Sequence, residues 1–152
     1  MRITIAAVGR WRSGSVRRLY EDYVRRLDWP IALREIDSGR GSSAAVRRRR
    51  EGERLAAALP RGATVVVLDE RGDQLDSAAF AARLQRWRDG GTRELAFVIG
   101  GADGLDGSLK ERAAAALAFG RQTWPHLLVR AMLAEQLYRA YAISIGHPYH
   151  RD

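Results

Sequence analysis

Two short segments carry residues that could do chemistry. The first is Gly100-Gly101-Ala102-Asp103-Gly104, which follows the apolar run Leu95–Ile99 and precedes a stretch of helical character. Glycines at such a turn let a ligand approach the backbone and leave N–H groups free to bind it. Taken alone, the pattern fits a tight turn as well as a ligand site. It lacks the G-x-G-x-x-G spacing of dinucleotide folds and the Gly-Lys-Ser/Thr of a phosphate loop, which disfavours nicotinamide and nucleoside triphosphates.

The second segment is the C-terminal tail, Gly146–Asp152, which contains His147, Tyr149, His150 and Arg151. Histidine and arginine side by side offer a proton acceptor and a cation, the groups that general-base catalysis and anion stabilisation use. The alternative, a frayed terminus, is by itself the more common case. Because the chain has no cysteine, thiol nucleophiles and thiolate ligands are excluded, and the two histidines alone do not predict a metal site.

Hydrophobic periodicity predicts the elements that position these segments. Strands are expected over 2–8, 31–36, 63–69 and 95–99, and helices over 16–28, 44–59, 78–89, 108–117 and 127–144. Ser15, Asp76 or Ser77, and Ser108 are the expected N-caps, while 38–43 and 119–126 are expected to be irregular. This alternation indicates one α/β domain over 1–152, with a mostly parallel sheet and helices on both faces.

The last predicted helix has no single polar face. Its polar residues spread around most of the circumference, so the helix must be covered on more than one side. In a small domain that cover is often a second subunit, and we therefore expect a homodimer through this helix. A central helix within one core is the alternative, although few elements remain in the chain to wrap it. Arg130 and Arg139 on this helix could pair with Glu135 or touch RNA.

Positive charge is concentrated in the first part of the chain. The 152 residues carry a net charge of +8, and residues 1–60 hold 14 arginines against 7 acidic residues. A GC-rich genome would explain the preference for arginine over lysine, but not its position. The basic half indicates a polyanionic partner, most plausibly nucleic acid. The run Arg47–Arg50 favours contact with an RNA backbone over a merely solvated helix face. No apolar run is long enough for a membrane span.

Nearly the whole chain resembles the RlmH family of the SPOUT superfamily, small RNA methyltransferases. The resemblance rests on the start of the chain, the glycine turn and a long C-terminal block. The matching segments are Ile5–Gly9, Tyr20–Arg26, Val67–Asp69, Val98–Leu105, Thr123–Arg130, Glu135–Ala140 and His147–Arg151. The C-terminal block with its closing Tyr-His-Arg is the most specific part.

The resemblance implies a fold with a C-terminal trefoil knot, which general rules of topology would not predict. It also implies that S-adenosylmethionine (SAM) is the cofactor and that the acceptor is N3 of a pseudouridine in 23S rRNA, which we expect to be methylated in the assembled ribosome. RNA and a second copy of the chain are the implied partners, with no DNA, membrane or metal, and the cytoplasm is the expected location. Methyl transfer from a sulfonium needs neither metal nor thiol.

Residue roles are carried over by the same resemblance. Tyr149, His150 and Arg151 are expected to bind substrate or act catalytically, from the tail of one subunit onto the cofactor of the other. His126 is expected to fix a loop or to pack against the last helix. The expected cofactor contacts are Leu68, Gly100, Phe119, Gly120, Arg121, Gln122, Thr123 and Trp124.

The segment Phe119-Gly120-Arg121-Gln122-Thr123-Trp124 departs from the Leu-Ser-x-Met/Leu-Thr-Leu/Phe pattern expected of the family. Backbone contacts survive such changes, whereas pocket size and polarity need not. Two other functions therefore stay open. One is methylation of another RNA, such as tRNA. The other is a non-catalytic RNA- or ribosome-binding dimer whose cofactor pocket has degenerated.

Overall fold

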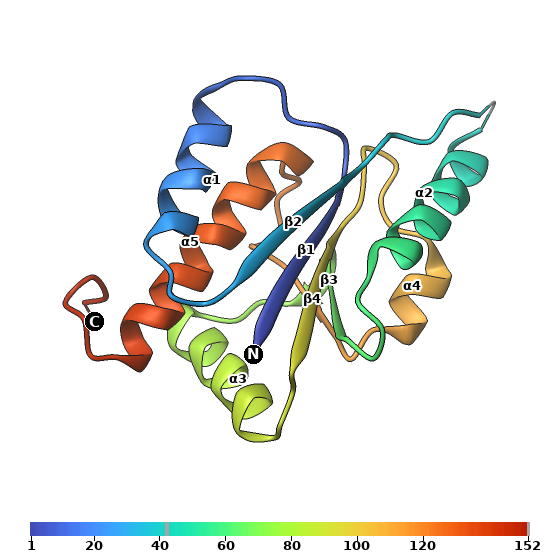
Figure 1. The fold of residues 1–152 in the computed structure, drawn as a ribbon. Coiled ribbons are helices and arrows are strands. Elements are labelled where there is room, and N and C mark those ends of the chain that lie inside the picture. Colours follow the sequence, from blue (N-terminus) through green and yellow to red (C-terminus); the bar gives the residue numbers. More distant parts are fainter. Residues whose placement is uncertain (42, 152) are drawn as a thin grey trace.

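A computed structural model describes residues 1–41 and 43–151, so the predictions that fall on Ser42 and Asp152 lie outside the described residues. Five parallel strands form one sheet in the order β2-β1-β4-β3-β5 (Figure 1). The strands are β1 (Arg2–Val8), β2 (Ile31–Ile36), β3 (Thr64–Asp73), β4 (Glu94–Ile99) and β5 (Ala115–Leu117). The predicted α/β fold with a parallel sheet is confirmed.

Helices cover both faces of this sheet, as predicted. They are α1 (Ser15–Arg25), α2 (Ala44–Ala58), α3 (Ser77–Asp89), α4 (Gly107–Arg112) and α5 (His126–Ser144). On one face α5 lies between α1 and α3, and the other face carries α2 and α4 (Figure 1). The continuous apolar runs of β1 and β4 are buried on both faces because these two strands are central.

The predicted helix over 108–117 is wrong in its second half. It ends at Arg112, and Ala115–Leu117 instead form β5, which pairs with β3 from Val66 to Leu68. Alanine favours helices, so local propensity pointed the other way. Pairing with the free edge of β3 decides the outcome, and neither helix propensity nor a three-residue pattern reveals it.

The N-caps follow the prediction at one helix and differ at two. Asp76 caps α3 by accepting a hydrogen bond from the N–H of Ala79 at 2.7 Å. At α4, Asp106 rather than Ser108 is the cap, and its carboxylate accepts from the N–H of Ser108. At α1 the cap position is Gly14, and no side chain caps the helix.

The long helix α5 is covered largely by its own chain. Because α1, α3 and the sheet surround it, no α5 residue before Ser144 is fully exposed. The expectation that few elements remain to wrap this helix is therefore wrong, and the homodimer needs other support. Within the described residues, no helix is long and apolar enough to cross a membrane. The C-terminal knot stays a prediction.

Candidate active site

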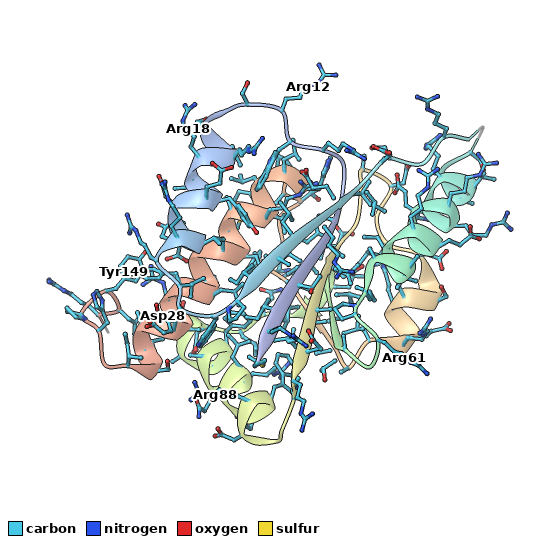
Figure 2. All side chains as sticks on the ribbon, viewed as in Figure 1. Arg12, Arg18, Asp28, Arg61, Arg88 and Tyr149 are labelled. Atoms are coloured by element: carbon cyan, nitrogen blue, oxygen red, sulfur yellow. The ribbon has the colours of Figure 1, made fainter. Side chains whose placement is uncertain are left out.

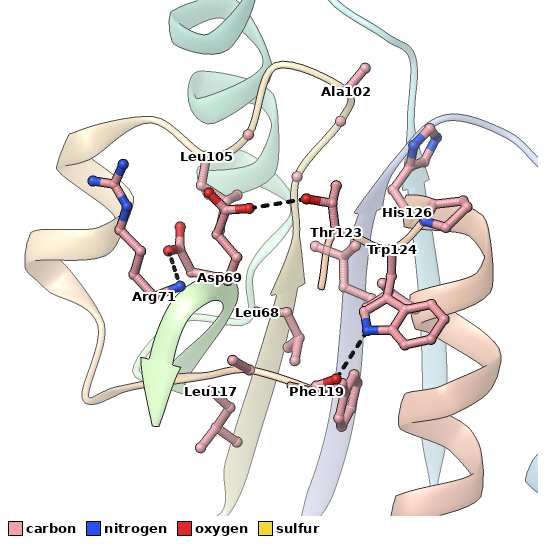
Figure 3. A pocket seen from close by; sticks show the side chains of 18 of the residues that line it. Leu68, Asp69, Arg71, Ala102, Leu105, Leu117, Phe119, Thr123, Trp124 and His126 are labelled. Atoms are coloured by element: carbon pink, nitrogen blue, oxygen red, sulfur yellow. Dashed lines mark hydrogen bonds between the residues drawn. The ribbon is translucent and has the colours of Figure 1, made fainter. Parts of the chain in front are cut away.

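A pocket of about 900 Å³ opens at the carboxyl ends of β3 and β4, where parallel sheets usually bind ligands (Figure 3). Its walls come from the end of β3, the glycine turn after β4, the loop after β5 and the first turn of α5. The volume lies in the range of small-molecule sites. The pocket brings together seven of the predicted cofactor contacts, namely Leu68, Gly100, Phe119, Gly120, Gln122, Thr123 and Trp124. Arg121 is not among the lining residues.

The first two glycines of the turn, Gly100 and Gly101, have no room for side chains. A Cβ on Gly100 would lie 2.9 Å from the carbonyl carbon and oxygen of Gly104, and one on Gly101 would lie 3.0 Å from Oε2 of buried Glu51. Gly104 has a φ of +81°, which favours glycine, and its N–H donates to the Gly101 carbonyl at 3.0 Å. The turn is closed on itself and rests on Glu51 of α2, so its shape is fixed before any ligand arrives.

The loop 118–125 offers its backbone to a ligand. The indole N–H of Trp124 donates to the carbonyl of Phe119 at 3.0 Å, which closes the loop on itself (Figure 3). Among the described residues, no protein acceptor is recorded for the backbone N–H groups of 119–124. Gly120 has a φ of +97° and open space beyond it. This loop can therefore bind a polar group through backbone donors, while Phe119 and Trp124 supply apolar surface.

One wall of the pocket is charged. Asp69, which follows the last β3 residue paired with β4, forms an ion pair with Lys110 of α4 and accepts from the N–H of Arg71 at 3.0 Å. Partial burial raises the pKa of Asp69, but the hydrogen bonds from Lys110 and Arg71 outweigh it, and the net pKa lies below its ordinary value. Asp69 is thus an ionised acceptor at the pocket. The sequence analysis did not predict a role for Lys110. The one feature that distinguishes this residue in the sequence is that it is the only lysine in an arginine-rich chain.

His126 also lines the pocket, at the start of α5. Burial lowers its pKa, the charge of Arg130 lowers it further, and the charge of Glu51 opposes them. The imidazole packs against Gly9, where a Cβ would lie 3.1 Å from Nε2. A histidine kept neutral can accept a proton or orient a polar group. Packing against the last helix was expected of His126, whereas its place in the pocket wall was not.

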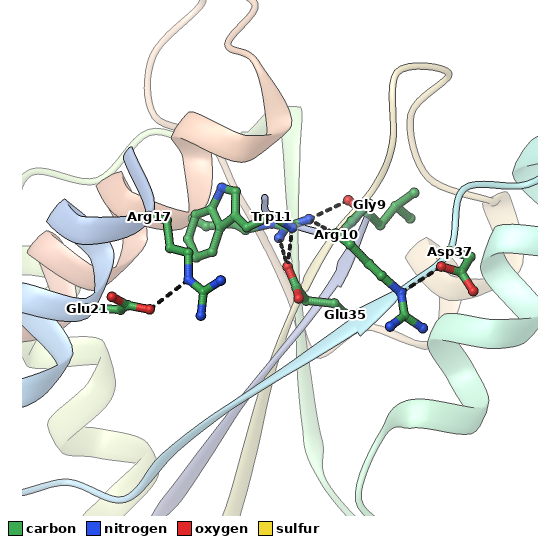
Figure 4. A network of polar contacts seen from close by, with 9 residues as sticks. Gly9, Arg10, Trp11, Arg17, Glu21, Glu35 and Asp37 are labelled. Atoms are coloured by element: carbon green, nitrogen blue, oxygen red, sulfur yellow. Dashed lines mark hydrogen bonds and ion pairs between the residues drawn. The ribbon is translucent and has the colours of Figure 1, made fainter. Parts of the chain in front are cut away.

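Arg130 fixes this end of α5 to the sheet. Its side chain is fully buried, donates to the carbonyls of Val8 and Gly9, and forms an ion pair of 2.8 Å with Glu35 of β2 (Figure 4). The guanidinium also lies 4.9 Å from the ring centre of Trp11. The expectation that Arg130 pairs with Glu135 or reaches RNA is wrong for this residue, because it is enclosed by the carboxyl ends of β1 and β2.

The C-terminal tail lies at the opposite end of α5 from the pocket (Figure 1, Figure 2). The Tyr149 hydroxyl lies 3.0 Å from Oε1 of Glu135 and 3.2 Å from the hydroxyl of Tyr23, and its ring packs on Tyr138. Arg139 pairs with Glu135, as expected, and stacks over the Tyr149 ring at 4.8 Å. Burial and these hydrogen bonds raise the pKa of Tyr149, so its hydroxyl stays protonated. Tyr149 anchors the tail.

The tail does not reach the pocket of its own chain. The 19 residues of α5 separate them by roughly 28 Å at about 1.5 Å per residue. Fully extended, the chain from Ile145 to Arg151 spans about 21 Å, and Glu135 and Tyr23 hold Tyr149 beside α5. Neither Tyr149, His150 nor Arg151 lines the pocket. The structure thus brings together most of the predicted cofactor contacts, but not the predicted catalytic residues. Among the described residues, no cluster of three or more His, Cys, Asp or Glu could hold a metal ion.

Comparisons with known proteins point to one family. Residues 1–150 match a family model described as "Predicted SPOUT methyltransferase". A protein of Rhodospirillum centenum named ribosomal RNA large subunit methyltransferase H is 54% identical over 151 residues, covering 99% of both chains. Proteins of the same name from Paramagnetospirillum magneticum and Paracoccus denitrificans are 52% and 49% identical, over 99% and 100% of both chains.

A solved methyltransferase from Legionella pneumophila, in complex with SAM, shares the fold. The likeness has a TM-score of 0.50 at 9% identity and covers 93% of this chain and 66% of that one. With a family model that matches almost every residue and full-length relatives at about half identity, the chain belongs to the SPOUT methyltransferase family, together with the proteins named ribosomal RNA large subunit methyltransferase H.

Proposed function

We propose that the protein transfers the methyl group of SAM to N3 of a pseudouridine in large-subunit rRNA, acting as a homodimer on the assembled ribosome in the cytoplasm. The observation that carries this proposal is the preformed pocket at the glycine turn, in a chain whose full-length relatives are named as large-subunit rRNA methyltransferases.

The pocket suits a cofactor such as SAM, which combines an aromatic base, a sugar and an amino acid. Leu68, Phe119 and Trp124 offer apolar surface for the base, and the backbone N–H groups of 119–124 are available as donors at its edge. Asp69 is an ionised acceptor suited to a hydroxyl or ammonium group. The departures of this loop from the expected family pattern leave its backbone donors intact, which argues against a degenerated pocket.

SAM supplies an electrophilic methyl group on a sulfonium, and the chain must position the acceptor nitrogen in line with it. N3 of the base carries an imide proton that has to leave for the nitrogen to attack. A cation near the ring stabilises the developing anion, and an imidazole accepts the proton. Arg151 and His150 of the tail are the groups that we assign to these tasks.

The tail performs them on the partner subunit's pocket. Its own pocket lies elsewhere, and Tyr149 is held to Glu135 and Tyr23 of its own chain. His150 lies beside Arg139, with Nδ1 at 3.5 Å from Nη1, and Arg151 is exposed. In this composite site one subunit binds the cofactor and the other supplies the groups that handle the acceptor. The dimer is then required for methyl transfer, and this argument for a dimer does not depend on how α5 is covered.

The test is a transfer assay with SAM labelled in its methyl group. Ribosomes from a strain lacking the corresponding gene, the same ribosomal RNA stripped of protein, and tRNA are offered as separate acceptors. We expect label in the large-subunit rRNA of ribosomes and little in the other two. Label in tRNA alone would refute the substrate assignment. Absence of both transfer and calorimetrically detectable SAM binding would refute the assignment as an enzyme.

A further inference from the structure

A second cleft lies outside the cofactor pocket, between the loop that follows β2 and the exposed side of α2. It has a volume of about 380 Å³. Asp37 and Ser38 from the loop line it together with Arg40, Arg50 and Arg54. None of these residues lines the pocket at the glycine turn. We call this group, Asp37, Ser38, Arg40, Arg50 and Arg54, the arginine cleft.

The arginine cleft carries more positive charge than its own acid can balance. Its three arginines face one carboxylate, and that carboxylate already binds Arg10 outside the cleft, with Nε of Arg10 at 2.7 Å from Oδ1 of Asp37. The pKa of Asp37 lies below its ordinary value, first through the hydrogen bond and charge of Arg10, with Arg54 and Arg40 adding to it. Arg50 and Arg54, four residues apart on a helix, repel each other.

These arginines keep most of their donors free for a ligand. Arg50 donates to the carbonyl of Arg40, and Nη1 of Arg54 donates to the carbonyl of Asp37 at 3.1 Å. A guanidinium has five N–H donors in a planar fork, so each of these contacts leaves several donors unused. Convergent forks with surplus positive charge match a phosphate group, which accepts paired hydrogen bonds.

The four arginines of the run Arg47–Arg50 make different contacts. Arg47 pairs with Asp103 of the glycine turn, with Nε at 2.7 Å from Oδ2, and Nη1 of Arg48 lies 3.4 Å from the Asp103 carbonyl. Arg49 faces Glu53 at 3.8 Å across exposed surface. Only Arg50 of the four joins the arginine cleft. The expectation that the whole run contacts RNA is therefore too broad, because Arg47 is engaged within the fold.

We propose that the arginine cleft binds a phosphodiester group of the large-subunit rRNA and thereby docks the enzyme beside its substrate. The proposal rests on the proposed function for the identity of the RNA. Positions 47 and 54 of α2 are separated by roughly 10 Å along the helix axis. A phosphate in the cleft thus lies close to the glycine turn that Arg47 contacts, and the same helix serves RNA docking and the cofactor pocket.

The experiment measures binding of the full-length dimer to ribosomes from the deletion strain over a series of salt concentrations. In the variant Arg40→Gln, Arg50→Gln, Arg54→Gln we expect the slope of log K against log salt to become shallower by about 1 or more, corresponding to at least one lost phosphate contact. Near 0.1 M salt this corresponds to about eightfold weaker binding per contact. SAM affinity and the melting temperature should stay close to those of the parent chain.

Two matched variants separate phosphate binding from other effects. Arg61→Gln, Arg86→Gln, Arg93→Gln removes the same charge from exposed positions outside the arginine cleft and should leave the slope nearly unchanged. Arg40→Lys, Arg50→Lys, Arg54→Lys keeps the charge but loses the forks and the contacts to loop carbonyls. We expect it to retain most of the slope.

Three outcomes would overturn the proposal: a parental slope in the cleft variant, an equal loss in the control variant, or an equal loss in the lysine variant. The last would mean that loop conformation, not charge, determines binding. The readout is binding and not turnover. A parent chain that binds ribosomes but transfers no methyl group would refute the proposed function alone, and the comparison of slopes would still decide whether the cleft contacts RNA.

Discussion

Two inactive variants should restore activity when they are mixed, if the tail of one subunit completes the pocket of the other. The first variant ends after Gly146 and keeps its pocket. The second, Gly100→Val, keeps its tail but has a blocked pocket, because a Cβ at this position would already lie 2.9 Å from the Gly104 carbonyl. Contacts of this kind need about 3.5 Å, so the turn must shift by roughly half an ångström and the cofactor loses its cradle.

The magnitude follows from the geometry. Even fully extended, the chain from Ile145 to Arg151 spans about 21 Å, less than the roughly 28 Å length of α5, and Tyr149 is held against α5 by Glu135. Every working site must therefore combine two subunits. When equal amounts are unfolded and refolded together, about half of the dimers are mixed, and each mixed dimer has one complete site of two. The mixture should show about a quarter of the parental activity per subunit, and each variant alone almost none.

The assay is transfer of labelled methyl groups to ribosomes from the deletion strain, with the mixture measured before and after co-refolding. As a control, the parent chain is co-refolded with a chain carrying both changes; these mixed dimers would have one complete site only if tail and pocket came from the same subunit. In that mixture no mixed dimer has an intact pocket facing an intact tail, so activity should come from parental dimers alone. No recovery in the first mixture, with dimers and melting temperatures intact, would refute the reach argument.

Three further predictions concern single residues. Gly100→Val alone should weaken SAM binding by tenfold or more, about 1.4 kcal/mol, measured by calorimetry; if only the melting temperature falls, the turn is structural. Arg130→Ala should lower the free energy of unfolding in urea by about 3–5 kcal/mol, because it leaves Glu35 without the partner that a fully buried guanidinium provides. The exposed pair of Arg17 serves as its control and should cost about 0.3–0.5 kcal/mol on substitution by alanine; equal losses would contradict the structural role of Arg130. For His126, burial holds the pKa below 6.5, so the unfolded chain binds more protons on acidification through that value and stability should fall. His126→Gln should flatten this dependence in urea unfolding between about pH 5 and 7, and an unchanged slope would show that the imidazole is not buried in solution.

The regular elements could be predicted where one local pattern dominates. We predicted β1 and β4 from their apolar runs and α1 from its apolar periodicity. Burial on one or both faces of an element requires apolar residues at regular positions in its sequence. β5 could not be predicted, since three residues carry no period and pairing with β3 overrides the helix propensity of alanine.

Some parts of the candidate site could likewise be predicted from the sequence, and others could not. The glycine turn could be located from the sequence because it follows a buried apolar strand. The loop 119–124 that faces it was predicted to bind the cofactor only from the family resemblance. Arg130 and Glu35 are 95 residues apart, and nothing local in either predicts their ion pair. The place of His126 in the pocket wall follows from that pair, because Arg130 holds the first turns of α5 against the ends of β1 and β2.

The tail was the most specific part of the sequence resemblance, yet its position could not be derived from the residues. Tyr149 is held by Glu135 and Tyr23, which are 14 and 126 residues away in the chain. Only the fold shows that these contacts hold Tyr149 beside the middle of α5, away from the pocket at its first turn, so that the tail does not line the pocket of its own chain.

The central claim is methylation of a pseudouridine at N3 in large-subunit rRNA, and mass spectrometry of that rRNA tests it most directly. Nucleosides and fragments of 23S rRNA would be compared between the parent strain, a strain lacking the gene, and that strain carrying either the full chain or the chain ending after Gly146. The account predicts one missing methyl group on a pseudouridine in the deletion strain, restored by the full chain and not by the shortened one. An unchanged set of methylated nucleosides in the deletion strain would contradict it.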